Sequence, residues 1–182
     1  GDQAGGIVFG SDTTEIIRPA RRRRSVMQLL HALSAHQRVR PATAPDPGSE
    51  GLNEALTEAR RIAHTGSRVF VISDFQGADS NTRSLLSGLA MHNQVTAALL
   101  TDPMDDHLPG QGDYAVGGAA GTLWFNGDDR SLQRAWREGA QARYTALETL
   151  FRQTGTHLMT LATGEDPVAL MHGLTSAGGR LL

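Results

Sequence analysis

Val69-Phe70-Val71-Ile72, followed directly by Ser73-Asp74-Phe75, is the stretch of sequence that decides the fold. Its first four residues form a continuous apolar run that does not alternate with polar residues. Such a run is typical of a strand buried on both faces, as in a parallel sheet covered by helices. We therefore expect a buried strand over residues 69–72 that ends at the polar break.

Helical and strand patterns lie on both sides of this stretch. Apolar residues recur three or four positions apart in the helical segments, and short apolar runs between turn residues mark the strands. Before the buried strand we predict a β-hairpin over 6–9 and 14–18 and two helices. The first helix begins at the capping box of Ser25 and Gln28 and has the apolar stripe Val26, Leu29, Leu30 and Leu33, and the second runs from Leu52 to near Gly66. After the buried strand we predict a helix around 85–90, a strand over 95–100, an irregular hairpin around 114–116 and 123–125, a helix over 131–153, a strand over 157–161, and a final helix that begins at Asp166-Pro167 and ends at Gly178-Gly179.

A hairpin followed by alternating helices and buried strands favours the α/β class. The predicted architecture is a three-layer α/β/α sandwich, with a mostly parallel sheet and the antiparallel N-terminal hairpin at its edge. We expect one domain over residues 1–182, with an irregular hairpin inserted over 103–130. Val69, Val71, Ile72, Leu99, Trp136 and Leu147 are expected in the core, Arg21–Arg24 on the surface, and Trp124-Phe125 packed against the body, the alternative for this pair being a tip that docks a partner.

The composition excludes several classes of protein. With 39% hydrophobic and 20% charged residues among 182, the chain can build a core, and its net charge of −2 gives no reason to expect wholesale binding to a polyanion. Cysteine is absent, which excludes a disulfide scaffold, a zinc-thiolate site and a thiol nucleophile. Every basic residue is arginine, so a phosphate-binding loop with its lysine is also excluded. No apolar run is long enough for a membrane-spanning helix.

The polar residues that follow the predicted strands mark the edge where a ligand would bind. In parallel sheets ligands sit outside the carboxyl ends of the strands, which selects Ser73–Phe75, Thr101-Asp102 and the loop over 41–51. Asp74 is the strongest candidate, because a carboxylate at a strand end can ligate Mg²⁺ or act as a base. The alternative, which is the more frequent role for such an aspartate, is a cap or a local bond to loop amides.

Other candidate motifs favour ordinary surface roles. The run Arg21–Arg24 has the charge to contact phosphates, but no aromatic residue interleaves it and the chain as a whole is slightly acidic. We interpret it as a solvated helix start, and we expect no nucleic-acid partner. The seven histidines are scattered without metal-ligand spacing, and no nucleophile elbow occurs.

The order of motifs along the chain resembles the von Willebrand factor type A-like domains, in the bacterial branch called domain of unknown function 58. The residues that carry the resemblance are Gly1-Asp2 to Phe9-Gly10, Arg18-Pro19 with the basic stretch after it, Leu52-Asn53-Glu54-Ala55-Leu56, Val69 to Phe75, Asp102-Pro103 and Thr163 to Pro167. The resemblance covers nearly the whole chain. It implies that the central first strand of the domain and its first helix are missing, because the sequence starts where the second strand would start.

The resemblance also implies a cation site, which this chain holds only in part. Such domains often bind Mg²⁺ through an Asp-x-Ser-x-Ser motif at the first strand, a Thr before the third helix and an Asp after the fourth strand. Asp74 matches the last of these, whereas the Thr position falls on Glu50 beside Ser49, and the first motif is absent. The metal ligands implied are therefore Asp74, Ser49 and Glu50, an incomplete and weak set. No cofactor is expected in this chain alone, and Mg²⁺ is expected only where a longer parent protein supplies the missing motif.

The resemblance implies a non-enzymatic protein-interaction module. Its expected partner is a MoxR-type AAA ATPase, in complex assembly or maturation, in the cytoplasm or on the cytoplasmic face of the membrane in a longer parent. A homo-oligomer is also expected, because the strands beside the missing one would expose unpaired edges. The alternative is a metal-assisted hydrolase or phosphotransferase with Asp74 at the strand tip, which would need a second carboxylate such as Asp102 or Asp46.

Overall fold

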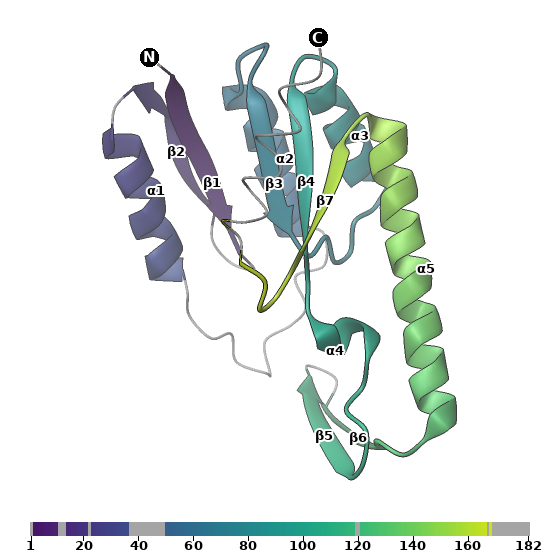
Figure 1. The fold of residues 1–182 in the computed structure, drawn as a ribbon. Helices are drawn as coiled ribbons and strands as arrows, with labels where there is room; N and C mark the ends of the chain where they lie inside the picture. The colour runs from purple at the N-terminus through teal and green to yellow at the C-terminus, as the bar shows by residue number, and fades with distance from the viewer. Residues whose placement is uncertain are drawn as a thin grey trace.

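A computed structural model describes residues 2–10, 14–21, 23–36, 50–118, 121–166 and 168. In these ranges the protein has a mixed α/β structure (Figure 1). In chain order the elements are β1 (Gln3–Phe9), β2 (Thr14–Arg21), α1 (Arg23–His36), α2 (Glu50–Ile62), β3 (Arg68–Ser73), α3 (Ser80–Ala90), β4 (Gln94–Thr101), α4 (Pro103–Asp106), β5 (Asp113–Gly118), β6 (Gly121–Asn126), α5 (Arg130–Thr154) and β7 (His157–Ala162). The short helix α4 was not predicted, and the predicted final helix and most of the 41–51 loop lie outside the described residues.

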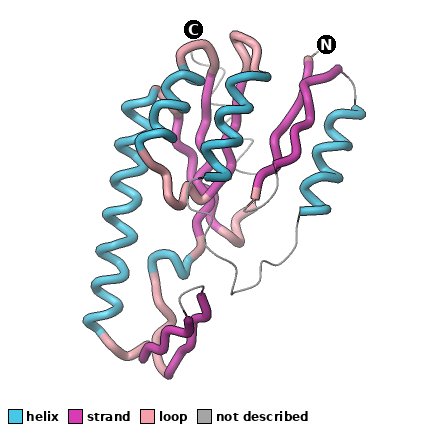
Figure 2. Tube along the Cα trace, turned by 180° about the vertical axis from the view of Figure 1, so that it is seen from behind, coloured by secondary structure: helices cyan, strands magenta, loops and turns pink. Residues whose placement is uncertain are grey.

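The centre of the molecule is a three-stranded parallel sheet. Its strand order is β3-β4-β7, so β4 lies in the middle. Val71 of β3 is aligned with Ala97 of β4, which is aligned in turn with Leu158 of β7. Helices α2, α3 and α5 pack on one face of this sheet, as Figure 2 shows from behind. The core between them and the sheet contains Leu52, Leu56, Val71, Phe75, Leu85, Leu86, Leu89, Val95, Ala97, Leu99, Leu147, Leu150 and Phe151.

Strand β3 alternates between the core and the surface, which corrects one prediction. Val71 is 7% exposed and Val69 packs against the core, whereas Ile72 is 58% exposed and Phe70 is 48% exposed. The continuous apolar run led us to expect burial on both faces. The described helices cover only one face of the sheet, so the prediction that Ile72 belongs to the core is wrong. Leu99 and Leu147 are buried, as predicted.

The N-terminal hairpin forms a small unit of its own with α1. Among the described residues β1 and β2 pair only with each other, so the hairpin is a separate antiparallel sheet and not an edge of the parallel one. Val8, Ile17 and Ala32 are buried between the hairpin and α1, with Leu29 packed against them. The rest of the predicted stripe on α1 is exposed, namely Val26, Leu30 and Leu33. Arg21, Arg23 and Arg24 are exposed as predicted, and Arg22 lies outside the described residues.

A close backbone approach joins this hairpin to the rest of the domain. A Cβ atom at Gly51 would lie 2.8 Å from the carbonyl oxygen of Gly10, so only glycine fits there without a shift. Gly51 is in the first turn of α2, and Phe9, at the end of β1, packs against the main core. The hairpin is therefore attached at the start of α2.

Helix α5 extends past the end of the parallel sheet (Figure 1). The Asp129 carboxylate caps its first turn, and Gly155 ends it in the left-handed conformation, at a φ of 70°. Its second half packs on the core through Leu147 and Phe151, whereas Trp136 in the first half is 44% exposed. The indole Nε1 of Trp136 donates to the Met104 carbonyl at 3.1 Å. The prediction of Trp136 as a core residue is wrong, because the sheet does not reach this part of the helix.

The β5-β6 hairpin lies below the parallel sheet in Figure 1, near the start of α5. The rings of Tyr114 and Phe125 stack on one face of the hairpin, with centroids 5.4 Å apart. Trp124 is on the opposite face and is 72% exposed. The prediction that Trp124 packs the hairpin onto the body is therefore wrong, and Phe125 alone is partly buried.

Thr82 joins α2 to α3 through a buried hydroxyl group, and its replacement gives a first testable prediction. The side chain is fully buried, its Oγ1 donates to Asn53 Oδ1 at 2.8 Å, and it accepts from the Asp79 amide at 3.1 Å. We expect Thr82→Val to lower the free energy of unfolding by about 1–3 kcal/mol, because it removes both of these hydrogen bonds at a buried position. The control is Ser84→Ala, at an exposed position two residues further along α3, which should lower the free energy of unfolding by less than about 0.5 kcal/mol. Urea denaturation measures both, and equal effects would contradict the prediction.

Candidate functional site

The carboxyl end of β3 forms a tight turn that places Asp74 at the surface. Ser73 Oγ accepts a hydrogen bond from the Phe75 amide at 3.0 Å. Phe75 has a φ of 53°, a left-handed conformation that costs energy for any residue with a Cβ atom. Its ring is 2% exposed and meets the Phe151 ring edge to face, at a centroid distance of 4.9 Å. Packing of this ring stabilises the strained turn, so the position of Asp74 is fixed by its neighbour.

The Asp74 carboxylate makes local hydrogen bonds. Its Oδ1 accepts from the Gln76 amide at 3.1 Å and lies 3.5 Å from Ser73 Oγ. The Asp74 carbonyl oxygen accepts from Arg143 Nη2 of α5 at 2.7 Å. These contacts match the interpretation of Asp74 as a turn residue, and a second role as a cation ligand stays a prediction.

Asp102 follows β4 at the same edge of the sheet, and both of its carboxylate oxygens accept hydrogen bonds. Oδ1 accepts from the Met104 amide at 2.9 Å, which caps α4, and Oδ2 accepts from Thr163 Oγ1 at 2.7 Å. The Thr163 hydroxyl and then the Met104 amide lower the pKa of Asp102 below its ordinary value. A lowered pKa makes a carboxylate a weaker base, which disfavours Asp102 as a general base at neutral pH. These bonds contribute to stability above the ordinary pKa and are lost as the pH falls through the lowered one.

The remaining predicted ligands do not complete a cation site in the described structure. Glu50 is the first residue of α2 and is exposed, whereas Ser49 and Asp46 lie outside the described residues. No group of three or more His, Asp or Glu side chains is placed to hold a metal ion within the ranges that the structure describes. Asp74, Glu50 and Asp102 therefore do not form a described metal centre.

We expect this chain to bind Mg²⁺ and Mn²⁺ only weakly. The one matching ligand, Asp74, already bonds its own turn, and an octahedral site needs six oxygens. Isothermal calorimetry with either ion should show no saturable heat at micromolar concentrations, for the natural chain and for Asp74→Asn alike. Tight binding that Asp74→Asn abolishes would contradict the prediction and would favour the metal-assisted enzyme.

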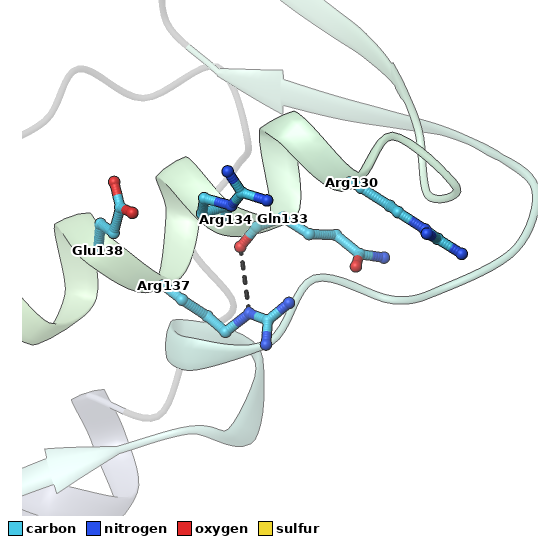
Figure 3. A pocket seen from close by; sticks show the side chains of 5 residues that line it. All are labelled: Arg130, Gln133, Arg134, Arg137 and Glu138. Atoms are coloured by element: carbon cyan, nitrogen blue, oxygen red, sulfur yellow. Dashed lines mark hydrogen bonds between the residues drawn. The ribbon is translucent and has the colours of Figure 1, made fainter.

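A second candidate surface lies on the first half of α5, and the sequence analysis did not single it out. Three arginines at positions i, i+4 and i+7 line a shallow hollow of about 400 Å³, together with Gln133 and Glu138 (Figure 3). They are Arg130, Arg134 and Arg137. In the described part of the chain no carboxylate is recorded as an ion-pair partner for these three guanidinium groups. The arginine spacing on the predicted helix was the signal that could have identified this hollow.

One of the three arginines, Arg130, lies in the first turn of α5, where the helix dipole acts on its charge. Positive side chains are unfavourable near a helix N-terminus, and α5 has no acidic residue in its first turn. The cap residue Asp129 offsets part of the cost, and the hydroxyl of Ser131 and the amides of Leu132 and Ser131 lower the pKa of its carboxyl group.

Exposed apolar side chains belong to the elements beside the hollow: Met104 on α4, Leu123 and Trp124 on β6, and Trp136 on α5. We call these four residues, with Arg130, Arg134 and Arg137, the α5-end surface.

The fold and its surfaces define a mixed α/β domain with a parallel sheet and an exposed basic and aromatic surface at one end. The family model described as "Protein of unknown function DUF58" matches residues 1–146, and the chain belongs to this family. No curated protein and no solved structure matches the chain. Within the described residues, no helix has the length and apolar character needed to cross a membrane.

Proposed function

We propose that this chain is a non-enzymatic protein-interaction module of the von Willebrand factor type A-like kind, with the three-layer arrangement of that class. Its proposed partner is a MoxR-type AAA ATPase, in complex assembly or maturation, in the cytoplasm or at the cytoplasmic face of the membrane. The partner and the setting rest on the resemblance of the sequence, and the chemistry of contact rests on the α5-end surface.

The observation that carries the proposal is the exposure of Trp124, at 72% of its surface, on β6 at the end of the molecule where α5 begins (Figure 1). Arg130, Arg134 and Arg137 of α5 have no ion-pair partner among the described residues. Large aromatic side chains are costly to leave in water, and Trp and Arg are the residues that contribute most at protein interfaces. The described carboxylates at the sheet edge are held in caps and turns, so no described contact favours the alternative enzyme with Asp74.

The proposal predicts a measurable affinity for the MoxR-type ATPase of the same organism. Interferometry with the immobilised chain should show saturable binding, which Trp124→Ala weakens by about tenfold or more, as for an interface hot spot. Met91→Ala is the matched control, because Met91 is 73% exposed at the end of α3, outside the α5-end surface. Absence of binding by the natural chain would overturn the partner, and equal affinity of the Trp124→Ala variant would overturn the surface.

A further inference from the structure

The first half of α5 brings like charges together along one side of the helix. Arg130, Arg134 and Arg137 are at positions i, i+4 and i+7, which span roughly 10 Å of the helix (Figure 3). We call these three residues the arginine stripe. Like charges three or four residues apart destabilise a helix, and the helix dipole adds to this cost for Arg130 in the first turn. An anion from outside the helix would relieve this arrangement.

The described part of the chain does not supply this anion. Within it the arginine stripe forms no ion pair, and its guanidinium groups donate one hydrogen bond, from Arg137 Nε to the Gln133 carbonyl of the same helix at 3.3 Å. Glu138 follows Arg134 by four residues and lines the same hollow, but the two side chains form no ion pair (Figure 3). The hollow therefore has three positive groups against one negative group, and the positive groups are available to a ligand.

Apolar side chains lie on the flank of the arginine stripe. Trp136 comes between Arg134 and Arg137 in the sequence, and its indole Nε1 donates to the Met104 carbonyl of α4 at 3.1 Å. Trp136 is 44% exposed and Met104 is 58% exposed. A ligand that matches this surface needs carboxylates on one side and apolar residues beside them.

We propose that the α5-end surface binds an acidic amphipathic helix of a partner protein, whose carboxylates pair with the arginine stripe and whose apolar side chains pack on Met104 and Trp136. The inference rests on the proposed function, because it names the chemistry of the segment that the interaction module binds. Arginine and carboxylate form strong charge-assisted pairs. A helix matches the spacing, because its side chains at i, i+4 and i+7 also span roughly 10 Å, whereas three side chains on one side of a strand span roughly 13 Å.

The charges favour an acidic protein segment over a nucleic acid. Nucleic-acid sites neutralise several phosphates, about 6–10 in the larger ones, and the arginine stripe has three positive groups. A phosphate backbone longer than the stripe would meet the exposed carboxylates of Asp128 and Asp129, which precede Arg130 in the chain. The net charge of −2 for the whole chain also opposes a polyanion.

Synthetic peptides test the proposal on the full chain. The probe is a helical peptide with glutamate at positions i, i+4 and i+7 and leucine on the flank of these glutamates, and its matched control has glutamine in place of each glutamate. Fluorescence anisotropy should show saturable binding of the glutamate peptide, about tenfold tighter than that of the glutamine peptide and weaker at high salt. A single-stranded oligonucleotide is the third probe and should bind more weakly than the glutamate peptide.

A charge reversal tests the contact with the arginine stripe. Arg134→Glu should weaken binding of the glutamate peptide by about tenfold, and a peptide with arginine in place of its central glutamate should recover part of the affinity for this variant. Arg83→Glu is the matched control, because it changes the net charge equally at an exposed position on α3, outside the α5-end surface. This control should bind the glutamate peptide as the natural chain does.

The outcomes separate this proposal from the proposed function. Absence of binding by the glutamate peptide, or equal binding of the glutamine peptide, would overturn the acidic helix. Tighter binding of the oligonucleotide, lost in Arg134→Glu, would overturn it in favour of a nucleic acid. Peptide binding that depends on Arg134, without binding of the ATPase, would overturn the ATPase partner alone. Binding of the ATPase that Trp124→Ala weakens, with no peptide binding, would overturn the acidic helix alone.

Discussion

Val71→Asp is expected to unfold the domain. The Val71 side chain is 7% exposed in the middle of β3, where it belongs to the core between the sheet and helices α2, α3 and α5. A carboxylate at this place would be buried without a partner, at a cost of several kcal/mol. Domains of this size are stable by only about 5–15 kcal/mol, so one such cost removes most or all of the stability. Far-ultraviolet circular dichroism and gel filtration would show loss of structure or aggregation.

The neighbouring residue supplies a matched control for this prediction. Ile72→Asp makes a similar change one position along the same strand, on the sheet face that no described helix covers, where Ile72 is 58% exposed. This variant should stay folded, with a melting temperature closer to that of the natural chain than to that of Val71→Asp. A soluble Val71→Asp protein with an unchanged melting temperature would contradict the assignment of Val71 to the core.

The contrast between Val71 and Ile72 shows that a local sequence pattern predicts a strand but does not predict which of its faces is buried. An apolar run with few polar neighbours identifies a strand, and the structure has β3 at Arg68–Ser73. The run does not say how many helices cover the strand, because that depends on the number of layers. The same limit explains Trp136, which continues the apolar stripe of α5 but lies beyond the sheet, next to α4.

The candidate site shows the same division between local and long-range information. Position after a strand was enough to place Asp74 and Asp102 at the carboxyl ends of β3 and β4. The partners of these residues were not predictable, because the bond from Thr163 to Asp102 joins residues 61 positions apart in the chain. The left-handed conformation of Phe75 was not predictable either, since this position is occupied by phenylalanine and not by glycine or asparagine.

We expect the purified chain to self-associate, because β1 and β3 each have an edge that no described strand pairs. Within the described residues, β1 pairs only with β2, and β3 pairs only with β4. The free edge of β3 carries the apolar run over 69–72, and the one charge of the strand, Arg68, stands at its first residue, so the run itself has none of the charges or prolines that protect natural edges. Pairing with a second copy, by strand addition or exchange of the N-terminal hairpin, would satisfy these backbone groups at low cost.

Light scattering over a wide concentration range measures this association, and one substitution on β1 tests whether its edge is involved. The exposed Ala4→Lys on β1 introduces a charge that opposes strand pairing, so it should shift the protein towards monomer without unfolding it. Ala35→Lys, an equally exposed position on α1, is the matched control and should leave the association unchanged. A monomer of 19.4 kDa at every concentration would contradict the prediction. In that case the edges of β1 and β3 would have to be satisfied within one chain.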